Sequence, residues 1–324
     1  MLDKEVLQYK VGGLLYMPAF QKNIVQKISQ NKLPHLTSAA FCLEDSIRDD
    51  SVDEAEAALK IILQQLEELD PKLLPLIFVR IRSPRHLETF HEAIGCRSKI
   101  LTGYILPKFD MSNAGGYIQV AKAINAEFNA GRAKPIYVMP TLESNRIASI
   151  ATRRTELLSL KQALDEIKPI VLNVRVGVND LCNLYGLRRN MNQTIYDICV
   201  VRDILSDILN VFARDYVISG AVWNYFNGDN GGAWARGLQR ELELDKANGF
   251  IGKTAIHPAQ LPIIFDSLKV SQTDLDDANL LLDWKSDTHG VMKSADGSRM
   301  NEVKCHLAWA RRIKILSELY GVAQ

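Results

Sequence analysis

The stretch from Ala39 to Ile81 reads AAFCLEDSIRDDSVDEAEAALKIILQQLEELDPKLLPLIFVRI, and it indicates the fold class. Its two ends are short apolar runs of the kind that form buried strands, and a longer amphipathic segment separates them. That segment starts with the capping-box pattern Ser51-Val-Asp-Glu54 and ends before Pro71. The stretch therefore predicts a strand, a helix and a second, parallel strand.

The same unit recurs along most of the chain. The predicted strands are Gly13–Met17, Ala39–Leu43, Leu76–Ile81, Ile100–Leu106, Pro135–Met139, Val171–Val176, Tyr216–Val222 and Ile251–Ile256. Eight such repeats match the size of a (β/α)8 barrel, and the chain has neither the G-x-G-x-x-G nor the Walker pattern of nucleotide-binding sheets. We therefore predict an α/β protein with a TIM-barrel domain over residues 1–270.

Residues 271–324 fall outside the repeats and are predicted to form a C-terminal helical extension. Its last helix carries one apolar stripe, with Val303, Leu307, Ala310, Ile313 and Tyr320. Such a stripe must be buried against the barrel or against another subunit. We expect it to pack on a neighbouring subunit of a homo-oligomer. A Gly-rich stretch at 227–232 is either a plain loop or a lid or anion cradle beside the barrel opening.

Composition excludes several classes of partner. The 324 residues include 39 Lys and Arg against 38 Asp and Glu, which gives a net charge of +1, so neither nucleic acid nor a membrane surface is an expected partner. No apolar stretch has the length of a membrane span. The five cysteines are scattered and odd in number, which favours reduced thiols and a cytoplasmic location.

Polar residues follow several predicted strands directly, where the active sites of α/β barrels lie. They are Glu44, Asp45, Arg80, Arg82, Lys108, Glu143, Asp180 and His257. Strands five and six are neighbours in a barrel, so Glu143 and Asp180 are expected to lie together. Two carboxylates without a His or Cys suit Mg²⁺ or Mn²⁺, whereas the alternative is that each acid only stabilises a helix start. Arg80 and Arg82 are expected to point to one side and to bind an anion, or else to pair structurally.

The order of these residues resembles the citrate lyase β-subunit and HpcH/HpaI aldolase family of carbon–carbon bond lyases. The resemblance rests on the motifs LLYMPA (14–19), LEDSI (43–47), VRI (79–81), LPK (106–108), PTLE (140–143), VGVNDL (176–181), GKTAIHPAQ (252–260), GVM (290–292) and DGSRMN (296–301). No single motif is specific, but their succession spans nearly the whole chain.

This resemblance implies a Mg²⁺-dependent lyase or aldolase that acts on a β-hydroxy acid and gives or uses a pyruvate- or oxaloacetate-like enolate. Glu143 and Asp180 would be the metal ligands, Arg80 would bind the keto acid carboxylate, and Glu44 with Asp45 would orient Arg80. A bound divalent cation stabilises such an enolate as a Lewis acid, without a Schiff base.

Further strand-end residues, Arg82, Lys108, Lys253 and His257, are expected to contact substrate. An imine-forming role for Lys108 or Lys253 is the alternative route to the same bond cleavage.

The departures from the family pattern point to a different substrate. The family's tail aspartate is Asn301 here, and an amide cannot transfer a proton, so either Glu302 replaces it or cleavage of malyl-CoA-type thioesters is absent. Arg175, in the predicted sixth strand, adds a guanidinium to the barrel interior and favours a more anionic substrate. The alternatives are a phosphorylated or sugar-linked hydroxy acid without CoA, and a catalytically reduced binding or assembly subunit. We expect a homo-oligomer, a trimer or a multiple of one, with a small-molecule substrate.

Overall fold

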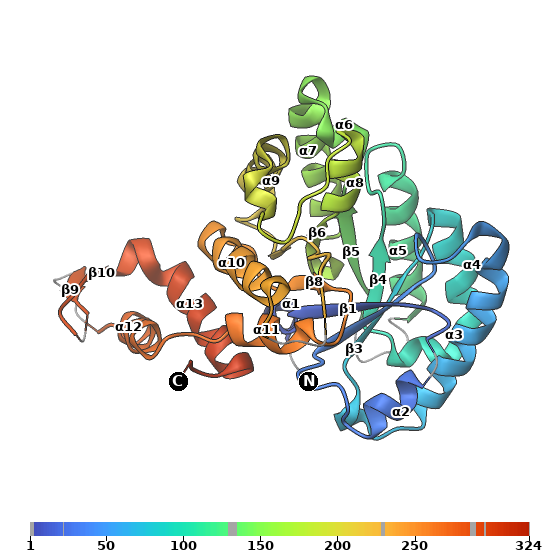
Figure 1. Cartoon of the computed structure of the whole chain (residues 1–324), viewed down its shortest axis with the longest axis horizontal. Coiled ribbons are helices and arrows are strands. Elements are labelled where there is room, and N and C mark those ends of the chain that lie inside the picture. Colours follow the sequence, from blue (N-terminus) through green and yellow to red (C-terminus); the bar gives the residue numbers. More distant parts are fainter. Residues whose placement is uncertain are drawn as a thin grey trace.

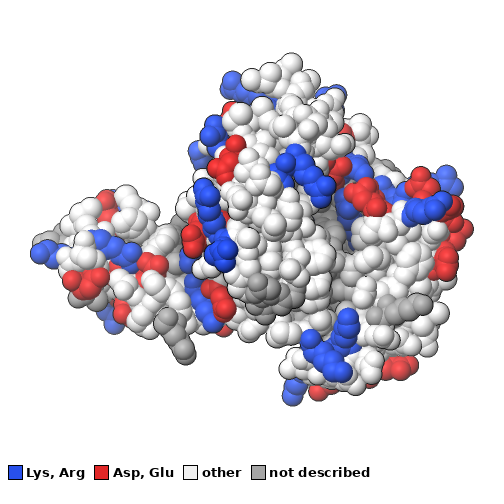
Figure 2. Space-filling model, viewed as in Figure 1, with Lys and Arg blue, Asp and Glu red and all other residues white. Residues whose placement is uncertain are grey.

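A computed structural model describes residues 3–21, 23–128, 135–227, 231–285, 290–294 and 296–323. Positions 228–230, the centre of the Gly-rich stretch for which a lid was considered, lie outside the described residues. Within this part of the chain, no helix is long and apolar enough to cross a membrane. On the face seen in Figure 2, basic and acidic side chains are interspersed, in keeping with the net charge of +1.

Eight parallel strands curl around a common axis, with helices on their outer side (Figure 1). The strands are β1 (Gly13–Pro18), β2 (Ser38–Cys42), β3 (Leu76–Arg80), β4 (Gly103–Leu106), β5 (Tyr137–Leu142), β6 (Val174–Val176), β7 (Ile218–Ser219) and β8 (Lys253–Ala255). They are hydrogen-bonded in the order β7-β6-β5-β4-β3-β2-β1-β8, and a single bridge between Gly220 and Lys253 joins the two ends. The predicted TIM barrel is confirmed, and each predicted strand overlaps an observed one.

The helices follow the predicted alternation with the strands. Those of the barrel are α1 (Lys4–Lys10), α2 (Ile24–Ser29), α3 (Val52–Glu67), α4 (Pro84–Ile94), α5 (Ala114–Phe128), α6 (Asn145–Ala148), α7 (Ile150–Asp165), α8 (Val178–Leu184), α9 (Cys199–Phe212), α10 (Ala233–Asn248) and α11 (Gln260–Ser267). The capping box predicted at Ser51 does not form. A short 3₁₀ turn, Asp49–Ser51, precedes α3, and the Ser51 hydroxyl donates to Asp50 Oδ1 at 3.0 Å instead of capping the helix.

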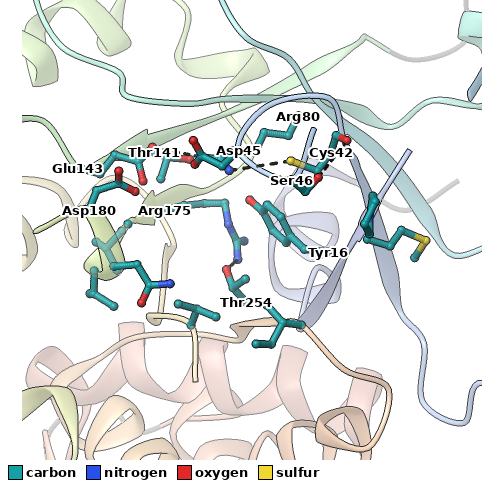
Figure 3. Close-up of a pocket in the computed structure, with 18 residues that line it drawn as sticks. Tyr16, Cys42, Asp45, Ser46, Arg80, Thr141, Glu143, Arg175, Asp180 and Thr254 are labelled. Atoms are coloured by element: carbon teal, nitrogen blue, oxygen red, sulfur yellow. Dashed lines mark hydrogen bonds and ion pairs between the residues drawn. The ribbon is translucent and has the colours of Figure 1, made fainter. Parts of the chain in front are cut away.

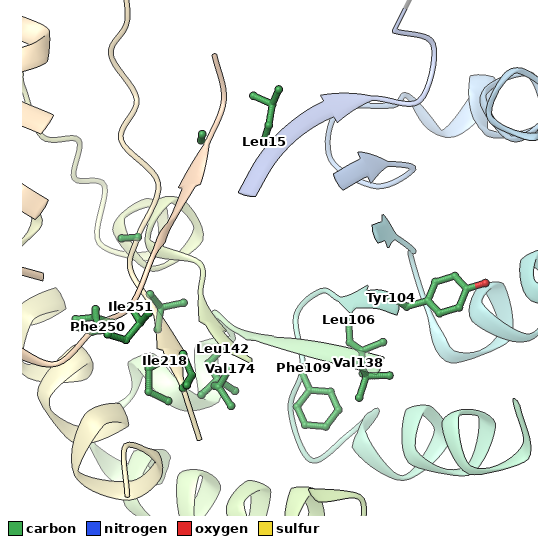
Figure 4. Packing of buried hydrophobic residues seen from close by; sticks show 14 of the residues in the cluster. Leu15, Tyr104, Leu106, Phe109, Val138, Leu142, Val174, Ile218, Phe250 and Ile251 are labelled. Carbon is green, nitrogen blue, oxygen red and sulfur yellow. The ribbon is translucent and has the colours of Figure 1, made fainter. Parts of the chain in front are cut away.

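The alternation of side chains along each strand separates two apolar layers. Outward-facing residues such as Leu15, Val138 and Val174 pack beneath the surrounding helices (Figure 4). Inward-facing residues of the first strands form a smaller cluster that Leu7 and Val11 close from below. This cluster also contains Leu14, Ala40, Phe78, Ile105, Tyr137, Met139 and Leu172. The barrel interior is therefore a packed apolar plug at its lower end.

The next inward positions along the strands are polar. Two residues after Leu14 stands Tyr16, and two residues after Phe78 stands Arg80. The same step leads from Met139 to Thr141. Because a strand repeats its direction every second residue, these polar groups sit directly above the apolar plug, toward the carboxyl ends of the strands.

The C-terminal extension consists of α12 (Gln272–Leu282), an antiparallel hairpin of β9 (Val291–Lys293) and β10 (Met300–Glu302), and α13 (Val303–Tyr320). Figure 1 shows the hairpin end of this unit projecting away from the barrel. The other end is anchored, because the Tyr320 hydroxyl donates to the Tyr9 carbonyl at 2.7 Å and its ring packs against Phe265. Part of the apolar stripe is therefore buried within the chain itself, and packing on a neighbouring subunit stays a prediction.

Candidate active site

A cavity of about 420 Å³ opens at the carboxyl ends of the strands, above the apolar plug. Its polar lining comes from six strands or the residues that follow them (Figure 3). These residues are Tyr16, Cys42, Asp45, Ser46, Arg80, Thr141, Glu143, Arg175, Asn179, Asp180 and Thr254. The volume lies within the range of small-molecule sites, and the position is that of TIM-barrel active sites.

Glu143 and Asp180 meet at the edge of this cavity, as the order of strands predicts. Glu143 follows β5, Asp180 lies in the first turn of α8, and their side chains are within hydrogen-bond reach. Glu143 is 4% exposed, and burial together with the charge of Asp180 raises its pKa to about 8. Two carboxylates held this close repel each other when both are ionised, and a divalent cation between them removes that cost.

The carboxylate pair is braced from two sides. Glu143 Oε1 accepts the backbone N–H of Lys108 at 2.8 Å and faces an Arg80 nitrogen at 3.4 Å. On the other side, Gly177 leaves room for Glu143, since a Cβ at that position would lie 1.7 Å from Glu143 Oε2. Within the described ranges, no group of three or more His, Cys, Asp and Glu side chains is placed to hold a metal ion.

Arg80 and Lys108 share the same two acids. Arg80 forms ion pairs with Glu44 Oε2 at 2.9 Å and Asp45 Oδ2 at 3.0 Å. Lys108 Nζ reaches the other oxygens of these acids, Glu44 Oε1 at 2.6 Å and Asp45 Oδ1 at 2.9 Å. Glu44 and Asp45 therefore hold both cations beside the cavity, and of these four residues Asp45 and Arg80 line it.

The state of Lys108 disfavours an imine route. Burial alone would lower the pKa of its amine, but hydrogen bonds to Glu44 and Asp45 outweigh burial and raise the pKa above its ordinary value. A protonated amine has no lone pair with which to attack a carbonyl. Lys108 is thus placed as a positive charge and not as a nucleophile.

Three residues expected to contact substrate lie elsewhere. One is Lys108, whose Nζ is held by Glu44 and Asp45 and does not line the cavity. Arg82 follows the end of β3 and turns away, donating to the Leu43 and Ile47 carbonyls and pairing with Asp49. It braces the loop after β2, so the expectation that it shares the direction of Arg80 is corrected. His257 stacks on Phe226 with ring centroids 4.4 Å apart and does not line the cavity.

Lys253 also requires a correction. It stands on β8 next to Thr254, and neighbouring strand residues point to opposite faces. Thr254 lines the cavity, whereas Lys253 points outward and is fully buried beneath α10, with Nζ 2.8 Å from Glu241 Oε1 and 2.6 Å from Asp245 Oδ2. This environment makes Lys253 a structural residue that docks a helix on the barrel.

Comparison with known families decides the class of the protein. Residues 5–322 match the family described as C–C bond lyase of the TIM-barrel fold. The chain belongs to this family of lyases. No curated protein sequence matches it significantly.

Solved structures share the fold of this lyase at low identity. CitE from Mycobacterium tuberculosis, in complex with magnesium, acetoacetate and coenzyme A, is 20% identical over 95% of this chain and 99% of its own, with a TM-score of 0.61. A citrate lyase from Burkholderia xenovorans LB400 is 16% identical over 96% of this chain and 92% of its own, with a TM-score of 0.70. A further structure, the citrate lyase β-subunit of M. tuberculosis with oxaloacetate and magnesium, is 20% identical over 80% of this chain and 98% of its own, with a TM-score of 0.52.

Sequence reasoning missed several cavity residues of this lyase, chiefly Tyr16, Thr141 and Thr254. The signal was the period-two alternation, because each stands two residues from an inward-facing neighbour. Asn301, which the resemblance places at a neighbouring subunit's active site, lies in β10 and does not line the cavity of its own chain. It is 3% exposed, and its side-chain amide nitrogen has no hydrogen-bond partner within the described part of the chain.

Proposed function

We propose that this lyase is Mg²⁺-dependent and acts on a β-hydroxy acid, giving or using a pyruvate- or oxaloacetate-like enolate. The observation that carries the proposal is the meeting of Glu143 and Asp180 at the edge of a cavity that also presents Arg80. Magnesium in neighbouring structures of the same fold supports this choice of cation.

Each of the polar residues at the cavity has a separate role in this proposal. Glu143 and Asp180 hold the cation, which when bound supplies Lewis-acid stabilisation of the enolate charge. Arg80 presents guanidinium nitrogens toward the cavity and binds the keto acid carboxylate. Glu44 and Asp45 fix the position of Arg80, so that little conformational entropy is lost when substrate binds.

Lys108 contributes positive charge beside the cavity, without lining it. Its ammonium group is kept protonated by Glu44 and Asp45, and its backbone N–H fixes one oxygen of Glu143. The apolar plug beneath the cavity excludes water from below, which strengthens these interactions. The chain therefore combines a site for a cation, an arginine that binds the substrate carboxylate, and an apolar plug beneath the cavity.

The alternative of a phosphorylated or sugar-linked substrate rests on three arginines expected in the barrel interior, namely Arg80, Arg82 and Arg175. Because Arg82 braces a loop instead, two of these three arginines, Arg80 and Arg175, line the cavity. With one arginine fewer in the cavity, the case for a phosphorylated substrate is weaker.

Titration calorimetry with Mg²⁺ tests the proposal. Glu143→Gln and Asp180→Asn are expected to weaken Mg²⁺ binding by at least about tenfold, since even the loss of a supporting partner has this effect on metal sites. Glu166→Gln is the matched control, because Glu166 is an exposed acid that forms an ion pair with Lys122 on the surface. Wild-type Mg²⁺ affinity in both site variants, with unchanged thermal unfolding, would contradict the assignment.

A further inference from the structure

Four arginines are buried among the described residues, and three of them have carboxylate partners. Arg80 pairs with three acids, Arg153 with Asp207 at 3.0 Å, and Arg189 with Glu241 at 2.7 Å. Arg175 is the exception. It is 2% exposed and forms no ion pair within the described part of the chain. A buried charge without a counter-charge is costly, so its retention calls for an explanation.

The neutral partners of Arg175 orient its guanidinium without compensating its charge. One terminal nitrogen donates to Thr254 Oγ1 at 2.6 Å and the other faces Asn173 Oδ1 at 3.5 Å. A further hydrogen bond runs to the phenol oxygen of Tyr16. Burial lowers the pKa of Arg175, and the positive charge of Arg80 lowers it further.

The side chain lies in the cavity wall and crosses from β6 toward β8. Figure 3 shows it reaching toward Thr254 beside the Tyr16 ring, with Glu143 and Asp180 further along the same cavity. Arg175 precedes Gly177 by two residues, so its backbone lies roughly 6–7 Å further back along the strand direction than the point where Gly177 meets Glu143.

The hydrogen-bond inventory of Arg175 is incomplete. A guanidinium has five N–H donors, and the contacts with Thr254, Asn173 and Tyr16 leave two for a ligand. Two donors match the two oxygens of a carboxylate. The cavity of about 420 Å³ has room for a substrate larger than a three-carbon keto acid.

We propose that Arg175, with Thr254 and Tyr16, binds a second carboxylate of the substrate, separate from the one held by Arg80. The site then selects dicarboxylic keto acids of the oxaloacetate type over monocarboxylic ones of the pyruvate type. This inference rests on the proposed Mg²⁺-dependent function, which it makes more specific.

Calorimetry with Mg²⁺ present and three ligands separates the two proposals. Oxalate chelates a metal but has no distal carboxylate, pyruvate has one carboxylate, and oxaloacetate has two. Wild-type protein is expected to bind oxaloacetate at least about tenfold more tightly than pyruvate, the effect of one hydrogen-bonded charge pair. Arg175→Met is expected to reduce this preference to less than about twofold and to leave oxalate affinity unchanged.

Arg82→Met is the matched control, since it removes a partly buried arginine that does not line the cavity, and it should keep the preference. No preference in the wild type, or an equal loss of all three ligands in Arg175→Met, overturns the Arg175 proposal. If the wild type shows no Mg²⁺-dependent binding of oxalate, the proposed function is overturned instead.

A measurement without metal keeps the Arg175 proposal testable in that case. Malonate is expected to raise the thermal unfolding midpoint of the wild type more than that of Arg175→Met. Equal stabilisation of the two proteins would refute the second carboxylate site.

Discussion

Gly177 shows how one residue type decides the position of a catalytic group. A Cβ at this position would lie 1.7 Å from Glu143 Oε2 and 2.6 Å from Glu143 Cβ. The backbone of Gly177 has a negative φ of −100°, so the requirement for glycine comes from space and not from a left-handed backbone.

Gly177→Ala is therefore expected to displace Glu143 and to weaken Mg²⁺ binding by at least about tenfold. The overall fold should persist, because the clash is with a side chain at a cavity edge. Calorimetry measures the affinity and circular dichroism the fold. Gly115→Ala is the control and should bind Mg²⁺ normally, because a Cβ added there would meet nothing within 4 Å beyond its chain neighbours and its own helix backbone.

Asp45 links the site to acid stability. Burial opposes ionisation, but hydrogen bonds with Glu44 and Lys108 and the charge of Arg80 lower the pKa of Asp45 from 3.8 to about 2. A lowered folded-state pKa contributes stability above the unfolded-state value, and that stability is lost as the pH falls through the folded-state value.

Between pH 4 and pH 2, wild-type protein is thus expected to lose stability relative to Asp45→Asn, which cannot titrate. Urea unfolding across this range measures the difference between the two proteins. A difference that does not change with pH would show that Asp45 gains nothing from its partners.

At the scale of elements, α10 is held on the barrel by a buried ionic cluster. Lys253 on β8 contacts Glu241 and Asp245 on α10, and Arg189 reaches the second oxygen of Glu241. Because these groups are shielded from water, each charge depends on the others for compensation.

Lys253→Met is expected to cost about 3–5 kcal/mol of unfolding free energy, because it leaves two buried carboxylates with one cation between them. The further change Asp245→Asn should restore part of this loss. Lys122→Met, which breaks an exposed pair with Glu166, should cost less than about 1 kcal/mol. Undiminished stability in Lys253→Met, combined with lost ligand binding, would return Lys253 to the substrate site.

At the scale of the whole molecule, the projecting hairpin carries apolar side chains on its outer face. The pairing of Met300 with Lys293 and of Glu302 with Val291 places these four residues on one side, and Asn301 with Met292 on the other. Met300 is 60% exposed and Val291 49%.

We predict that this face contacts a neighbouring subunit, so that light scattering at micromolar concentration gives the mass of a trimer or a multiple of one. The double variant Val291→Lys with Met300→Lys should reduce the mass, whereas Leu73→Lys, at another exposed apolar residue, should not. A monomeric wild type would refute the prediction.

Local patterns in the sequence were sufficient for the barrel and for part of the candidate site. Strand and helix periodicities are properties of short segments, and they located all eight strands. The rule that strand ends meet at one face then placed Glu44, Asp45, Arg80, Lys108, Glu143 and Asp180 together. The capping box predicted at the start of α3 was wrong, because the Ser51 hydroxyl donates to Asp50 and does not cap the helix.

Only the tertiary structure decided which way the remaining side chains point and what balances their charge. Arg82, His257 and Lys253 carry the right chemistry at plausible positions, but the end of β3, the Phe226 ring and the face of β8 turn each away from the cavity. The isolation of Arg175 from carboxylates is likewise invisible in sequence. It depends on residues from β1 and β8 that approach it only when the barrel closes, and a local pattern carries no information about such contacts.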